Sequence, residues 1–136
     1  MAVGLSAANV ANKLLAVLGQ TGTTFTAENM KVQIHTADPG SIGTTAVSTG
    51  NATKQTLTFG TSGNPSGGSM SITASPTAWS ITLSGSTTEN ITHISLWGAT
   101  TGNFLWSIAL ASPKTVNNGD SLQLTSLTLA LTPIAA

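Results

Sequence analysis

The sequence predicts a mainly β protein, a single antiparallel β-sandwich or jelly-roll-like domain with one short N-terminal helix. Three observations support this fold class. Short runs of alternating apolar and polar residues recur along the chain, as expected of strands with one buried face. Clusters of Gly, Asn, Asp, Ser and Pro separate these runs and are typical of turns. The chain has 136 residues and no cysteine, which indicates one domain without disulfides or thiolate metal sites.

Residues 1–30 are predicted to form the helix and a connecting arm. Ser6 can cap the start of the helix and Gly19 can end it. A helix this short needs packing against other elements, so it either covers one end of the β-domain or docks on a neighbouring subunit. Its apolar stripe, spaced at the helical period, consists of Val10, Leu14, Val17 and Leu18.

Residues 31–136 are predicted to form the antiparallel β-domain. The first strand covers residues 31–36, with Val32 and Ile34 facing inward, and the Asp-Pro-Gly sequence that follows predicts a tight turn. Residues 41–52 lack periodicity and are predicted to be a long surface loop, and residues 60–69 are rich in Gly and Ser. Further strands are expected at residues 54–59, 70–74 and 79–83.

Residues 91–131 show the strongest alternation and are expected to supply much of the core. Apolar runs around Leu96, Ile108, Leu122 and Leu129 are separated by a Thr-Thr-Gly-Asn and an Asn-Asn-Gly-Asp sequence, both typical of hairpin connections. The pattern therefore predicts an antiparallel meander of about four strands, and about eight strands in the whole chain.

Charge is unusually scarce. Charged residues make up 6% of the chain, against roughly 25% in typical domains, and the formal net charge is zero. A surface built from hydroxyls and amides is suited to contacts with other proteins, because burying a charge costs more free energy than burying a hydroxyl. The alternative interpretation is a merely Thr-rich extracellular β-domain.

Nucleic-acid and membrane binding are not expected. The four lysines, Lys13, Lys31, Lys54 and Lys114, are scattered, whereas phosphate neutralisation needs clustered basic residues. The longest apolar run near the N-terminus, residues 14–18, is far shorter than the ~20 residues of a membrane span, and no basic region precedes it as in a signal peptide.

The titratable residues do not form a recognisable catalytic or metal-binding motif. His35 and His93 have no second ligand at a metal-type spacing, so structural roles are expected for both. Asp38 and Asp120 lie in turn sequences, where short carboxylates bond their own backbone. Glu28 and Glu89 have no evident partner, and a G-x-S-x-G nucleophile motif is absent. We therefore assign no catalytic, cofactor-binding or metal-binding residue and expect no enzymatic activity.

The three tryptophans allow two interpretations. Trp79, Trp97 and Trp106 all lie in alternating runs, where large aromatic side chains most often belong to the core. Alternatively, an exposed Trp97 or Trp106 would provide a platform for carbohydrate, together with the polar loops at residues 41–52 and 60–69.

Several ordered segments stand out along the chain: Ile-His-Thr-Ala-Asp-Pro-Gly at 34–40, Thr-Lys-Gln at 53–55, Ile-Thr-His-Ile-Ser-Leu-Trp-Gly-Ala-Thr-Thr-Gly-Asn-Phe-Leu-Trp at 91–106, Pro-Lys-Thr-Val at 113–116 and Asn-Gly-Asp-Ser-Leu at 118–122. As a set they resemble small structural proteins of tailed bacteriophages, especially phages of actinobacteria. Such proteins are described as head decoration, minor tail or tail fibre proteins. The resemblance covers about residues 31–131 and implies a virion component without catalytic residues.

Together these observations lead to one main hypothesis and two alternatives. The main hypothesis is a non-enzymatic capsid-surface decoration protein, assembled into virions in the bacterial cytoplasm, that contacts the major capsid protein or other virion proteins. We expect a homo-oligomer, with a trimer as the specific guess. The first alternative is a tail fibre or tail-tip module that contacts carbohydrate on the host surface. The second alternative is an enzyme, which requires His and acid side chains to converge in one pocket.

Overall fold

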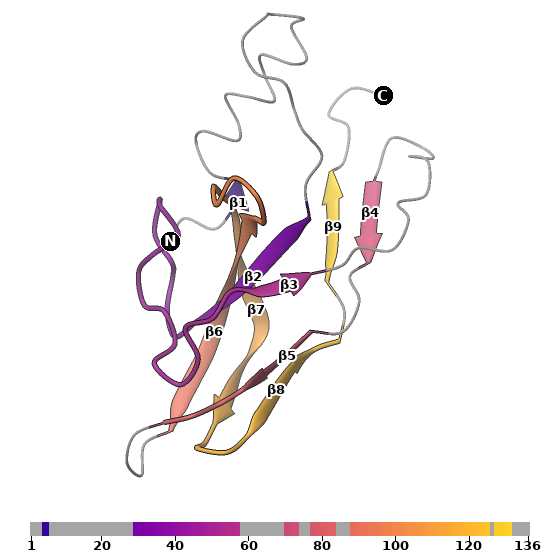
Figure 1. Cartoon of the computed structure of the whole chain (residues 1–136). Helices are drawn as coiled ribbons and strands as arrows, with labels where there is room; N and C mark the ends of the chain where they lie inside the picture. The colour runs from indigo at the N-terminus through magenta and orange to yellow at the C-terminus, as the bar shows by residue number, and fades with distance from the viewer. Residues whose placement is uncertain are drawn as a thin grey trace, which may run out of the picture.

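The protein is built from antiparallel strands (Figure 1). The computed structural model describes residues 4–5, 29–57, 70–73, 77–83, 88–125 and 127–131, and these contain no helix. This confirms the mainly β prediction, whereas the predicted helix between Ser6 and Gly19 lies outside the described residues. The strands are β1 (Gly4–Leu5), β2 (Met30–His35), β3 (Gln55–Leu57), β4 (Met70–Thr73), β5 (Thr77–Ser80), β6 (Glu89–Gly98), β7 (Phe104–Val116), β8 (Ser121–Leu124) and β9 (Thr128–Leu131).

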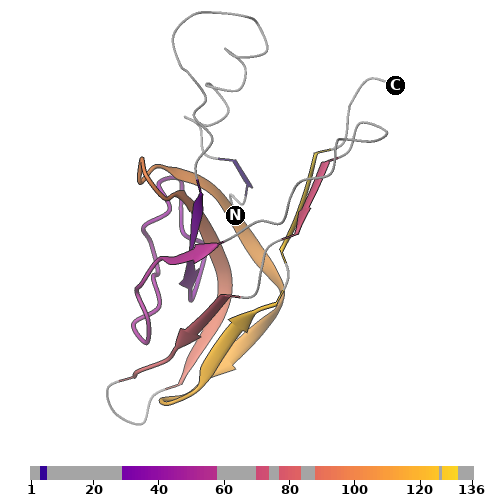
Figure 2. The same ribbon diagram turned by 45° about the vertical axis from the view of Figure 1, so that its right-hand side comes forward.

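Five strands form one sheet in the order β1-β7-β6-β2-β3, in which every neighbouring pair is antiparallel. The other four form two-stranded ribbons, β4 with β9 and β5 with β8. One sheet and two ribbons do not amount to the two complete sheets of a sandwich, so the sandwich or jelly-roll prediction is not confirmed. The views in Figures 1 and 2 show the β4–β9 ribbon extending away from the five-stranded sheet.

The predicted four-stranded meander at residues 91–131 is wrong in its second half. β6 and β7 pair as expected, but β8 pairs with β5 and β9 pairs with β4. The pairing continues with the same offset from one ribbon to the other. Thr73 pairs with Thr128 in the β4–β9 ribbon, and four residues away on each strand Thr77 pairs with Leu124 in the β5–β8 ribbon. β8 and β9 therefore pair with β5 and β4 in the reverse of their chain order.

The apolar core lies between one face of the five-stranded sheet and the β5–β8 ribbon. Strand β2 contributes Val32 and Ile34 to the core and strand β6 contributes Ile94 and Leu96, at alternate positions as the period of a strand requires, while the residues between them are buried on the other face. Val32 and Ile34 face inward as predicted. The core is shared among distant segments, and its buried members are Val32, Ile34, Leu57, Trp79, Ile81, Leu83, Ile91, Ile94, Leu96, Val116 and Leu127.

Residues 36–54 connect β2 to β3 and lie beside β2 and β6 (Figure 2, purple to magenta). Residues 41–52 of this segment were predicted to be a surface loop, and among them Gly43, Ser48 and Gly50 are buried. Its course is fixed by backbone hydrogen bonds to β2, including Ser48 N to Ile34 O at 3.1 Å. We refer to residues 36–54 as the covering loop.

Gly43 allows the covering loop to approach β7. Its φ is +74°, and a Cβ at this position would lie within 2.8 Å of three ring carbon atoms of Phe104. Gly102, in the turn between β6 and β7, has a similar φ of +69° but no atom within 4 Å of such a Cβ. The two glycines therefore separate the cost of backbone conformation from the cost of a steric clash.

We expect Gly43→Ala to destabilise the protein more than Gly102→Ala. Alanine at positive φ costs more than about 1 kcal/mol at either position, and the added methyl group collides with Phe104 only at position 43. Urea unfolding of both variants measures the difference in the free energy of unfolding. Equal losses would show that Gly43 is required only for its backbone conformation.

Candidate functional site

Polar residues gather on the face of the sheet that the covering loop packs against. Alternation along β2 and β6 places these residues opposite the apolar core face, and all of them are buried although they are polar or amphipathic. Because buried polar groups need hydrogen-bond partners, this face is where chemistry would be expected. Its buried members are Gln33, His35, His93, Ser95 and Trp97.

A chain of hydrogen bonds connects the loop to β6 through His35. The Nδ1 atom of His35 is 2.9 Å from the carbonyl oxygen of Thr45, and its Nε2 atom is 2.7 Å from the Ser95 hydroxyl. A carbonyl can only accept, so Nδ1 carries the proton and Nε2 accepts from Ser95. The Ser95 oxygen in turn accepts from Trp97 Nε1–H at 2.7 Å. Every polar atom in this chain therefore has a partner.

The Ser95–His35 pair has the geometry of a nucleophile and a base but not their surroundings. Ser95 and His35 are both 0% exposed, so a substrate has no access to the hydroxyl. The third group in the chain is a backbone carbonyl rather than the carboxylate that orients a catalytic histidine. The arrangement instead attaches the covering loop to the sheet.

His35 and His93 are brought together, which the sequence alone did not indicate. They occupy directly opposed positions on β2 and β6. His93 Nδ1 lies 2.7 Å from the Thr92 hydroxyl, while its Nε2 is buried without a hydrogen-bond partner among the described residues. No group of three His, Asp or Glu side chains suitable for a metal ion occurs in the described ranges.

Trp97 lies under a lysine rather than at the surface. It is 5% exposed, and Lys54 Nζ lies 3.1 Å from its ring centroid, a cation–π contact. The Phe104 ring packs against it with centroids 5.3 Å apart. Trp79 is 1% exposed and belongs to the core. Trp97 and Trp79 are therefore unavailable as a carbohydrate platform, and Trp106 is half-buried on β7.

Glu89 has several partners, contrary to the expectation that it had none. Its carboxylate accepts hydrogen bonds from the hydroxyls of Ser48 and Thr49 and from the backbone N–H groups of Thr49 (2.7 Å) and Gly50 (3.2 Å). Burial alone would raise the pKa of Glu89, but these hydrogen bonds together lower it below its ordinary value. The side chain therefore holds the end of the covering loop at the start of β6.

The two aspartates fulfil their predicted turn roles. Asp38 Oδ1 accepts from Gly40 N at 2.9 Å, and Asp120 Oδ2 accepts from Asn117 N at 2.8 Å. Glu28 falls outside the described residues. Within the part of the chain that the structure covers, no helix has the length and apolar character needed to cross a membrane.

These features define a charge-poor, antiparallel β protein whose buried polar side chains bind its own loop. A family model described as Podophage GP4 fiber I protein gp80 matches residues 5–132. The match spans most of the chain, so the protein belongs to this family of podophage fibre proteins. None of the curated proteins compared with the chain matches it.

The family match supports part of the resemblance inferred from the sequence. A bacteriophage structural protein of the fibre type, and hence a virion component, is supported. The narrower expectations, an actinobacterial phage and a head decoration protein, do not follow from the match. Its description favours the tail fibre alternative over the main hypothesis.

We expect acidification to destabilise the protein through His35. Burial lowers the pKa of His35 below its ordinary value of 6.5, the bond to the Thr45 carbonyl partly opposes this, and the charges of His93 and Lys54 lower the pKa further. The unfolded chain therefore takes up a proton at higher pH than the folded protein. The contribution of His35 to the free energy of unfolding is therefore fully present above pH 6.5, and it is lost as the pH drops below 6.5.

Urea midpoints at pH 7.5 and 5.5 test this expectation, with His35→Gln as the comparison. The wild type should lose stability between these pH values, and His35→Gln should lose less because it cannot titrate. An identical loss in both proteins would assign the acid sensitivity to another group.

Removal of the Glu89 charge should weaken the attachment of the covering loop. Glu89→Gln retains the shape of the side chain but loses charge-assisted bonds, so a destabilisation of about 1–2 kcal/mol is expected at pH 7. Asp120→Asn, which changes an exposed turn carboxylate, is the matched control and should cost less. Because the folded pKa of Glu89 is below 4.5, the difference between wild type and Glu89→Gln should shrink as the pH falls below that value.

Proposed function

We propose that this chain is a non-enzymatic tail fibre component of a podophage virion that assembles with other virion proteins and contacts the host cell surface. The observation that supports this proposal most directly is the family match over residues 5–132, whose description names a fibre protein. The buried Ser95–His35 pair favours a structural role over catalysis, since it serves to hold a loop.

The β4–β9 ribbon supports assembly with other chains. A two-stranded ribbon is at best marginally stable on its own in water. Among the described residues its outer strand edges have no partner strand, and unpaired edges are templates for pairing with other chains. The register places Ile72 opposite Leu129 and Met70 opposite Leu131, so two of the paired positions in the ribbon are apolar in sequence. We propose that further copies of the chain complete it, as a homo-oligomer with the trimer as the simplest form.

The outer surface of the covering loop is the part proposed to meet the host. Ser41, Ile42, Thr44 and Thr45 are exposed, and Ile42 is 66% exposed, the one large exposed apolar residue in the described part of the chain. Hydroxyl groups beside an apolar contact suit carbohydrate, whose surface carries both polar and apolar patches. Hydrogen bonds between the loop and the sheet hold the backbone that carries these side chains.

Particles that lack this protein distinguish a fibre from a decoration protein. Loss of a fibre should reduce adsorption to host cells strongly while leaving the heat resistance of filled heads unchanged. Loss of a decoration protein should lower heat resistance while leaving adsorption intact, because a protein that binds only the assembled shell stabilises it. Electron microscopy of particles carrying a tagged chain gives an independent answer, with label at the tail expected.

A further inference from the structure

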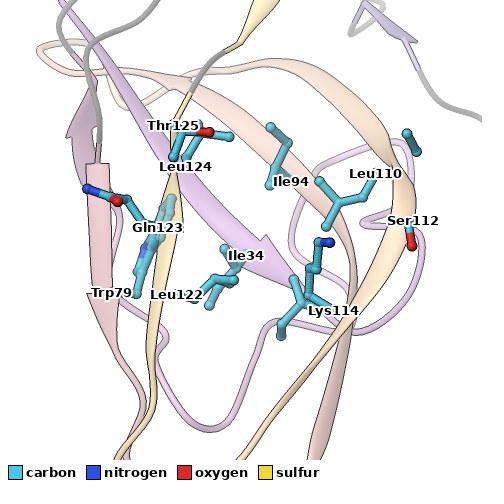
Figure 3. A pocket seen from close by; sticks show the side chains of 12 residues that line it. Ile34, Trp79, Ile94, Leu110, Ser112, Lys114, Leu122, Gln123, Leu124 and Thr125 are labelled. Atoms are coloured by element: carbon cyan, nitrogen blue, oxygen red, sulfur yellow. The ribbon is translucent and has the colours of Figure 1, made fainter.

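An apolar pocket of about 270 Å³ opens between β7 and β8. Its floor is formed by core side chains that are otherwise fully covered, including Ile34, Ile91 and Ile94, and Trp79 forms one wall. Figure 3 shows Trp79 at one side of the space, Leu110, Ser112 and Lys114 from β7 at the other, and Ile34 and Ile94 between them. The pocket is therefore an opening into the hydrophobic core.

The opening exists because β7 leaves β6 over a short stretch. Ile91 pairs with Lys114 and His93 pairs with Ala109, so only Thr92 lies opposite the four residues 110–113. Such a bulge bends a strand away from its partner. β8 pairs with β5 along one edge, and the register of the described residues gives it no partner on the edge that faces β7. No strand closes the gap between β7 and β8 in the described part of the chain.

The pocket combines an apolar interior with one positive charge. Lys114 is the single charged residue in its lining, and no described acidic side chain forms an ion pair with it. Its amine lies near Leu110 on one side of the pocket (Figure 3), while exposed Gln123 and Thr125 complete a polar rim. A buried apolar surface with one cation at its edge is complementary to a molecule with a hydrocarbon chain and one anionic end.

The volume indicates the length of that chain. An apolar protein cavity of about 150 Å³ holds benzene, with six carbon atoms. By proportion, 270 Å³ accommodates a hydrocarbon of about ten carbon atoms. We propose that the pocket between β7 and β8 binds a free medium-chain fatty carboxylate, with its hydrocarbon chain against Ile91, Ile94 and Leu122 and its carboxylate at Lys114. This site is independent of the fibre role.

Octanoate is the probe for this proposal, and 1-octanol is its uncharged match. Methyl NMR spectra of the full chain at constant protein concentration should show saturable shifts at Ile91, Ile94 and Leu122 with octanoate. Octanol should bind more weakly. Lys114→Gln should weaken octanoate binding about threefold, the effect of one exposed charge pair, whereas Lys31→Gln, outside the pocket, should leave it unchanged.

Two further variants occlude the pocket. Ala111→Trp fills it from an exposed position, and Leu122→Trp fills it from a half-buried one, so at least the first is expected to fold. Both should abolish the saturable shifts. The proposal is overturned if octanoate causes no saturable shift. It is also overturned if the wild type binds octanol as tightly as octanoate and Lys114→Gln binds octanoate as tightly as the wild type does. Shifts that follow protein concentration instead would identify the opening as a contact between copies of the chain.

Discussion

The hydrogen bonds that meet at the Ser95 hydroxyl hold the covering loop against the sheet. Ser95 links His35 on the neighbouring strand to Trp97 on its own strand, and His35 carries the connection to the loop at Thr45. Because an unpaired buried donor or acceptor costs about 1–3 kcal/mol, these groups are stable only when the loop is in place. The sheet therefore has an apolar core on one face and a hydrogen-bonded layer on the other.

Charged side chains are scarce in the whole chain, and the few that lie in the hydrogen-bonded layer do not pair with one another in the contacts described next. Glu89 binds hydroxyl and amide groups at residues 48–50 rather than a basic side chain, and Lys54 lies over an aromatic ring rather than beside an acid. Neither of these two contacts with the covering loop is an ion pair. Surface ion pairs contribute little stability in any case, while hydroxyl-rich surfaces remain easy to desolvate when chains associate. Both properties suit the assembly with other virion proteins that is proposed for this chain.

β-sheet pairing is incomplete at two places in the described part of the chain, and each of them carries one of the proposals made for this protein. Among the described residues, the β4–β9 ribbon has no partner strand on its outer edges, and the bulge in β7 leaves the core open beside β8. A closed barrel would have neither feature. The first is the site proposed to pair with other chains through their backbones, and the second is the site proposed to bind a small apolar molecule with a negative end. The proposed partners differ because the ribbon presents backbone groups, whereas side chains line the pocket.

The sequence by itself determined the strand content, the turns at Asp38 and Asp120 and the inward positions of Val32 and Ile34, because these depend on residues close together in the chain. Tertiary structure decided which strands pair, since alternation is the same whichever partner a strand meets. It also decided that β8 and β9 pair with β5 and β4, that His35 lies beside His93, and that Glu89 holds a loop some forty residues away. These contacts join distant segments through side chains whose local sequence carries no signal of their partner.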